Sequence, residues 1–157
     1  MTDSPLLEFR DVSVTYRTGS GPVPAVRGVD LTVDRGEVVG IAGESGCGKS
    51  TLAATILRLQ PANARVTGEV LVGGADVQSM RWGDLRALRW AGASMIFQGA
   101  LHSLNPVQRI GNQIAEPIRV HEPGVAEDDL RDRVAGLLEQ VGLSAGRAPA
   151  YPHQLSG

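Results

Sequence analysis

The chain has 157 residues, of which 42% are hydrophobic and 20% charged, and its formal net charge at pH 7 is -2. These values are typical of a folded globular domain and exclude a disordered chain. The basic residues form neither a block nor a stripe, so the composition indicates no nucleic-acid partner.

The N-terminus, the hydropathy and the cysteine count bear on the cellular compartment of the protein. The N-terminal residues lack the pattern of a secretory signal peptide, and no apolar run reaches the roughly 18 residues that span a bilayer. The single cysteine excludes an internal disulfide and suits a reducing compartment. We therefore expect a soluble, cytosolic domain, which is still able to attach to a membrane protein.

The first third of the chain predicts strands followed by one helix. Alternating β-branched and aromatic residues predict a strand over 6–16 and an antiparallel partner over 25–33, with a loop over 18–24 between them. The apolar run 38–43 predicts a strand buried on both faces. Helical spacing follows over 49–60.

The rest of the chain turns from strands to helices. The pattern predicts a hairpin with a Gly-Gly turn over 67–77, a short helix over 84–91 and a second buried strand over 94–98. The clearest amphipathic helix is predicted over 127–143. The residues that it would turn inward are Leu130, Val134, Leu137, Leu138 and Val141. We place a boundary between subdomains near Gly99.

The segment GESGCGKS, Gly43 to Ser50, matches the phosphate-binding pattern G-x-x-x-x-G-K-[ST] between a predicted strand and a predicted helix. Its glycines let successive backbone N–H groups point at one centre, and the helix adds its positive end. Lys49, the only lysine among 15 basic residues, is predicted to reach the β- and γ-phosphates, and Ser50 to offer a hydroxyl to Mg²⁺. The predicted nucleotide-contacting residues of this cradle are Gly43, Glu44, Ser45, Gly46, Cys47, Gly48, Lys49, Ser50 and Thr51.

Cys47 lies inside the cradle. We expect it mainly to contribute its backbone N–H. Its position at a helix N-terminus also predicts a thiol more reactive than that of a free cysteine.

Three further stretches narrow the class of phosphate-binding protein. Tyr16 ends the first strand, Gln98 ends the stretch MIFQ, and YPHQLSG matches the start of an L-S-G-G-Q signature. The order aromatic residue, cradle, strand-end glutamine and L-S-G resembles the ATP-binding subunits of ABC transporters. The stretches GALHSLNPV, QIAEPI and YPHQLSG resemble most the importers of dipeptides, oligopeptides and nickel.

The resemblance implies an α/β fold of the P-loop NTPase class, with a RecA-like core, an antiparallel β subdomain and a helical subdomain. Residues 1–98 would hold the N-terminal part of the ATP-binding core, and residues 99–157 the helical subdomain up to the signature. The chain stops inside the signature, so we expect an incomplete nucleotide-binding domain.

The resemblance also assigns roles to residues. Tyr16 would pack on the adenine ring, and Gln98 would touch Mg²⁺ or the attacking water, which makes it the candidate catalytic residue. Ser50 and Gln98 would be the metal contacts. Ser156 and Gly157 would bind the γ-phosphate of ATP held by the opposite subunit.

By this resemblance the parent protein binds ATP and Mg²⁺ and pairs head-to-tail with a second ATP-binding subunit. It would drive transmembrane permease subunits from the cytoplasmic face of the membrane, and would serve an extracytoplasmic substrate-binding protein indirectly. No apolar strand ending in acidic residues follows Gln98, nor does the family's switch histidine. We therefore expect these residues to bind ATP without appreciable hydrolysis.

Two alternatives stay open. One is a P-loop NTPase of another class, although a guanine-reading N-K-x-D stretch is ruled out because the only lysine lies in the cradle. The other is a non-catalytic nucleotide-binding protein with a regulatory or interaction role.

Overall fold

The computed structural model describes residues 4–97, 99 and 103–155. The chain divides into two compact units, Met1–Met95 and Ile96–Gly157, which are described separately. Within the described residues, no helix is both long enough and apolar enough to cross a membrane.

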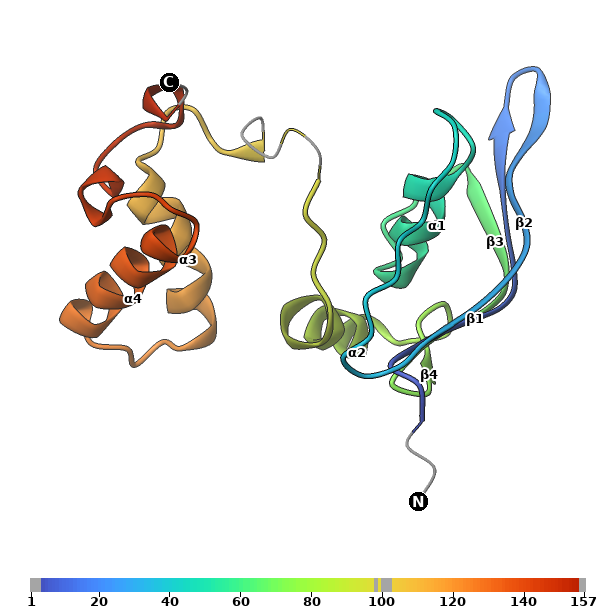
Figure 1. The fold of residues 1–157 in the computed structure, drawn as a ribbon, viewed down its shortest axis with the longest axis horizontal. Coiled ribbons are helices and arrows are strands. Elements are labelled where there is room, and N and C mark those ends of the chain that lie inside the picture. The colour runs from blue at the N-terminus through green and yellow to red at the C-terminus, as the bar shows by residue number, and fades with distance from the viewer. Residues whose placement is uncertain (1–3, 98, 100–102, 156–157) are drawn as a thin grey trace. The chain divides into compact units, whose positions relative to one another are not determined.

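The first unit is built on a four-stranded antiparallel sheet with the strand order β2-β1-β3-β4 (Figure 1). The strands are β1 (Leu7–Thr18), β2 (Gly21–Val33), β3 (Ala64–Val72) and β4 (Ala75–Asp76). The alternation in the sequence places one row of apolar side chains on the buried face. Together with Leu52 of the helix α1 (Lys49–Ile56), and with Val77 and Leu85, this row forms the core of the unit.

The predicted loop over 18–24 is wrong, because β2 begins at Gly21. Thr18 pairs directly with Gly21 across a two-residue turn, and the Thr18 hydroxyl donates to the Gly21 carbonyl oxygen at 2.7 Å. Two-residue turns match the twist of paired strands, so the hairpin extends through residues that read as loop.

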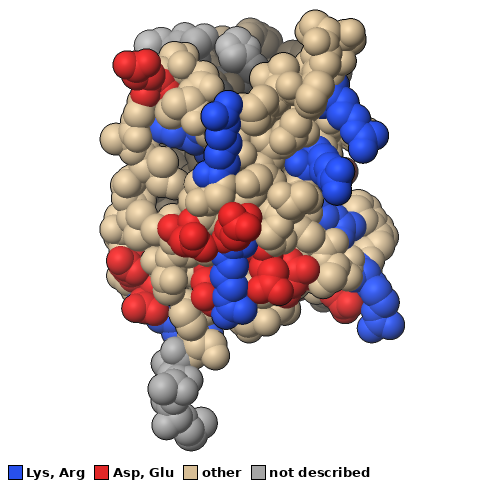
Figure 2. Space-filling model, turned by 90° about the vertical axis from the view of Figure 1, so that its right-hand side faces the viewer, with Lys and Arg blue, Asp and Glu red and all other residues tan. Residues whose placement is uncertain are grey.

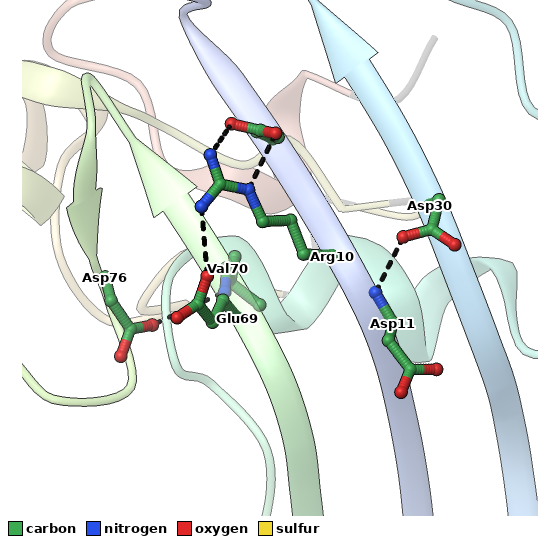
Figure 3. Close-up of polar contacts among 7 residues, drawn as sticks. Arg10, Asp11, Asp30, Glu69, Val70 and Asp76 are labelled. Atoms are coloured by element: carbon green, nitrogen blue, oxygen red, sulfur yellow. Dashed lines mark hydrogen bonds and ion pairs between the residues drawn. The ribbon is translucent and has the colours of Figure 1, made fainter.

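The sheet contains an irregularity at Asp11, a non-glycine residue with φ of 46°. The register of β1 shifts there on both sides. The Asp11 amide donates to the Asp30 carboxylate at 2.8 Å, and Arg10 bridges to Glu69 on β3 (Figure 3). The Asp30 carboxylate thus satisfies a backbone amide that the bulge removes from the ladder, and the Arg10–Glu69 pair links the side chains of β1 and β3 beside it.

The predicted hairpin with a Gly-Gly turn is confirmed. Gly73 and Gly74 connect β3 to β4 with φ of 57° and 82°, values that only glycine adopts at little cost. The Asp76 carboxylate accepts from the Val70 amide at 3.4 Å (Figure 3).

Two predicted buried strands are absent from the described part of the structure. Residues 38–43 and 94–97 have no strand hydrogen bonding, and Val38 and Ile96 are 96% and 91% exposed. A parallel strand forms only beside neighbours that hydrogen-bond to it and cover both of its faces. The described residues supply no such neighbours.

The helices of the first unit also differ in their limits from the sequence-based expectation. The helix α1 ends at Ile56 rather than near residue 60, because Arg58 takes a left-handed φ of 49°. The helix α2 spans Trp82–Ala87 and continues as a π-helical turn over Leu88–Gly92, where an α-helix was predicted to continue to residue 91.

The second unit packs the helix α3 (Ile110–His121) against the helix α4 (Glu127–Gln140). Leu130, Val134 and Leu138 are buried between them as predicted, but Leu137 and Val141 are 42% and 71% exposed. The helix ends three residues before the predicted limit, since Gly142 adopts φ of 78° and terminates it.

Charged side chains of both signs lie next to one another on the face of the molecule in Figure 2. That mixture agrees with the net charge of -2. Mixed charge of this kind is typical of a solvated surface rather than of a steering field for nucleic acid.

Candidate nucleotide site

The segment 43–48 forms the loop that precedes α1, and its glycines have different tasks. Gly46 and Gly48 have left-handed φ values of 80° and 97°. A Cβ atom at Gly48 would also overlap the Ala25 carbonyl oxygen on β2. Gly48 therefore lets the start of α1 approach the sheet directly, as a bulkier residue would not.

Lys49 is the first residue of α1 and turns its ammonium group back into the loop. Its Nζ donates to the carbonyl oxygens of Gly43 and Glu44, at 2.6 Å each, and lies 3.4 Å from the Cys47 Sγ. No carboxylate of the described residues forms an ion pair with Lys49. The ammonium group is therefore held by neutral acceptors, which an anionic phosphate can replace with stronger, charge-assisted bonds.

The N-terminus of α1 is open to a ligand. Its N-cap residue is Gly48, and no side chain caps the first turn. The first amides of a helix lack partners within the helix and carry the positive end of its dipole. Such an end is suited to binding phosphate groups.

Tyr16 connects the sheet to α1. Its hydroxyl lies 3.2 Å from the Thr51 Oγ1, in a partly buried hydrogen bond. Across the hairpin Tyr16 pairs with Val23, whose side chain is 48% exposed. Paired residues share a face of the sheet. The Tyr16 ring and the exposed Val23 side chain therefore lie together on the sheet face that borders α1.

Val23 is a candidate base-contacting residue that the sequence analysis missed. It lay in a stretch interpreted as loop. Only the register of the hairpin places it opposite Tyr16.

A cavity of ≈ 660 Å³ lies between β2 and the cradle. Lys49 and Cys47 line it together with the apolar side chains of Val29, Ile41 and Leu52. Its volume lies within the range of small-molecule sites.

Of the predicted metal contacts, the structure describes only Ser50, which is exposed in the first turn of α1. Among the described residues, no group of three or more His, Cys, Asp or Glu side chains could hold a metal ion. A single hydroxyl such as that of Ser50 suffices when phosphates are bound beside it, because Mg²⁺ then takes most of its ligands from nucleotide and water.

Three predicted site residues, Gln98, Ser156 and Gly157, lie outside the described residues, and their roles stay predictions. Glu44, Ser45 and Cys47 lie exposed in the loop. Their contacts to nucleotide through backbone amides stay predictions. The greater reactivity of the Cys47 thiol also stays a prediction.

A second charged cavity, of ≈ 780 Å³, lies in the helical unit where α3 turns into α4. Arg133 donates to the Glu122 carboxylate at 2.6 Å. This hydrogen bond lowers the pKa of Glu122 below its ordinary value of 4.5. The pair fastens the end of α3 to α4.

Comparison with known proteins agrees with this geometry. Residues 26–157 match the family model described as "ABC transporter". Over 156 residues the chain is 42% identical to the oligopeptide transport ATP-binding protein OppD of Mycobacterium tuberculosis, covering 98% of this chain and 26% of that protein. It is 36% identical to the dipeptide transport ATP-binding protein DppD of Lactococcus lactis subsp. cremoris, covering 100% of this chain and 46% of that protein.

The chain therefore spans a quarter to just under half of the length of these curated relatives. Two solved structures superpose on 96% of the chain at 27% identity, and the superposition covers 63% of each of them. One is the dimeric structure of MJ0796, a bacterial ABC transporter cassette, with a TM-score of 0.83. The other is the same cassette in a post-hydrolysis state bound to ADP and Pi, with a TM-score of 0.82. By the match of the family model to most of its residues, this chain belongs to the ABC transporter family, with the α/β fold of part of an ABC cassette.

Proposed function

We propose that the chain is the ATP-binding part of a subunit that powers import of peptides through an ABC transporter. The observation that carries this proposal is the Lys49 ammonium group, which among the described residues is held by neutral acceptors alone, in a glycine loop beside an uncapped helix start. The names of the relatives, which refer to oligopeptide and dipeptide transport, support the choice of substrate. Nickel, the other substrate expected from the sequence, has no support from these names.

ATP would bind with its phosphates over the cradle and its base toward Tyr16. Lys49 would leave the Gly43 and Glu44 carbonyl oxygens for the β- and γ-phosphates, and Ser50 would offer its hydroxyl to Mg²⁺. The aromatic ring of Tyr16, with Val23 beside it, would provide an apolar surface for adenine. The ADP-bound cassette structure supports nucleotide binding by this fold.

The assembly would be a head-to-tail dimer of two ATP-binding subunits, as the dimeric cassette structure supports. Ser156 and Gly157 would contact the nucleotide of the partner subunit. We propose permease subunits as the membrane-bound partners, which would place the chain peripherally on the cytoplasmic face. A substrate-binding protein would act through those permeases.

Hydrolysis would need groups that the 157 residues do not contain. No apolar strand ending in an acid follows Gln98 in the sequence. Phosphoryl transfer depends on positioning the water and neutralising charge around the γ-phosphate. We therefore propose that these residues bind MgATP and hydrolyse it very slowly.

Calorimetric titration of the 157-residue chain with MgATP tests the nucleotide site. Lys49→Ala removes the charged contact to the phosphates, so we expect the Kd to rise on the order of 100-fold. Arg35→Ala is the matched control, because it removes an exposed cation from the turn before the cradle, and its Kd should equal that of the wild type. Equal affinity of the wild type and Lys49→Ala would overturn the proposed function.

A further inference from the structure

The guanidinium group of Arg89 closes the end of α1 that lies farthest from the cradle. Its Nε donates to the Leu57 carbonyl oxygen at 2.9 Å, and its Nη2 donates to the Arg58 carbonyl oxygen at 2.8 Å. The same group lies 5.4 Å from the centre of the Trp82 ring. One side chain therefore contacts both the residues that end α1, Leu57 and Arg58, and an exposed aromatic residue of α2.

Arginine suits this position for geometric reasons. Its planar fork can give two hydrogen bonds in one plane while a face of that plane rests on an aromatic ring. The carbonyl groups at a helix C-terminus also favour a nearby cation. Lysine could keep the charge but not the paired hydrogen bonds with the stacking.

The end of α1 is fixed from a second side. Arg58 donates through its Nη1 to the carbonyl oxygens of Val77, Gln78 and Met80, the nearest at 2.9 Å. With only eight residues, α1 has little length over which to absorb a change at its start. A shift at Lys49 would therefore reach the residues that hold the far end.

Arg89 belongs to the π-helical turn Leu88–Gly92, which closes with a hydrogen bond from the Ala93 amide to the Leu88 carbonyl oxygen at 2.9 Å. Single π-helical turns are rare and frequently occur at functional sites. This turn lies in the sequence just before the stretch that ends in Gln98.

We propose that Arg89 is a positioning residue that transmits nucleotide occupancy of the cradle to the π-helical turn and to Trp82. The proposal rests on the nucleotide site proposed above. When phosphates draw the Lys49 ammonium group away from the Gly43 and Glu44 carbonyl oxygens, the first turn of α1 changes its contacts. The Leu57 and Arg58 carbonyl oxygens move with the helix, and Arg89 carries this movement to the residues around it.

The chain has two tryptophans, so Trp90→Phe leaves Trp82 as the sole tryptophan reporter. In that background we expect MgATP to change the tryptophan emission. Arg89→Gln should remove most of this change, while the Kd from calorimetry, which does not depend on tryptophan, changes by less than about threefold. Arg86→Gln, in α2 one turn before Arg89, is the matched control and should keep both the signal and the affinity.

The outcomes separate this inference from the proposed function. If MgATP does not bind, the nucleotide site fails; if it binds and Trp82 responds equally with and without Arg89, the relay is wrong. Arg89→Lys covers the case in which Arg89→Gln does not fold, and it should also lose most of the signal. Hydrogen exchange provides a second measurement, because MgATP should alter protection of the Ala93 amide in the wild type and not in Arg89→Lys. Unchanged protection in the wild type would contradict the proposal.

Discussion

Gly46 and Gly48 have the same kind of backbone conformation but carry different constraints. Both adopt φ values that favour glycine. A Cβ atom at Gly46 would meet no other atom within 4 Å, whereas one at Gly48 would meet the Ala25 carbonyl group. The cradle thus needs glycine at Gly48 for contact with the sheet, and at Gly46 for conformation alone.

We predict that Gly48→Ala lowers the free energy of unfolding of the chain by roughly 2 kcal/mol or more, because strain and steric overlap add. Gly46→Ala should cost about 1 kcal/mol, the conformational part alone. Urea unfolding of both variants measures the difference. Equal losses would show that the approach of Ala25 does not constrain position 48.

At the scale of elements, the ends of the helices depend on specific residues rather than on intrinsic helix propensity. The helix α1 ends where Arg58 turns left-handed and its carbonyl oxygen accepts from Arg89. The helices α3 and α4 are tied by the Glu122–Arg133 pair beside their connection. Such exposed pairs contribute little to stability at neutral pH. They still make stability depend on pH, because the pair is lost when the carboxylate is protonated.

The lowered pKa of Glu122 fixes the sign of that dependence. A carboxyl group whose pKa is lower in the folded state stabilises the fold above its unfolded value of 4.5, and this contribution disappears as pH falls through the folded pKa. We predict that α4 amides lose protection from hydrogen exchange more steeply below about pH 4.5 in the wild type than in Glu122→Gln. Glu139→Gln replaces an exposed acid on α4 and should behave like the wild type. Equal pH profiles for all three proteins would refute the role of Glu122 in this pH dependence.

In the molecule as a whole, the described residues leave unpaired backbone groups and apolar side chains uncovered in one segment. Val38 is 96% exposed, and Val39 and Ile41 follow it in a segment without strand partners. Unpaired strand-forming segments with apolar side chains promote association between chains. The relatives are two to four times as long as this chain, so their additional residues are candidates to cover this segment.

We predict that Val38→Asp reduces self-association of the 157-residue chain without loss of secondary structure, because it places a charge in the uncovered segment. Light scattering and circular dichroism measure the two properties. Val141→Asp changes a valine that is also exposed but stands at the end of α4, and it should leave scattering unchanged. A chain that is monomeric before any substitution would contradict this prediction.

Features that depend on contiguous residues followed from the amino-acid pattern alone. The Gly-Gly hairpin was predicted correctly because turn chemistry acts over a few positions. Helical periodicity found three of the five residues predicted to be buried on α4, Leu130, Val134 and Leu138, but Leu137 and Val141 are exposed. The cradle motif, together with Tyr16 and the stretches MIFQ and YPHQLSG, pointed to the family that the comparison identified. The folded structure was needed to show that residues 38–43 do not form a strand, that Val23 lies opposite Tyr16, and that Arg89 closes α1. Each of these depends on partners distant in the sequence, whose presence and register local patterns do not encode.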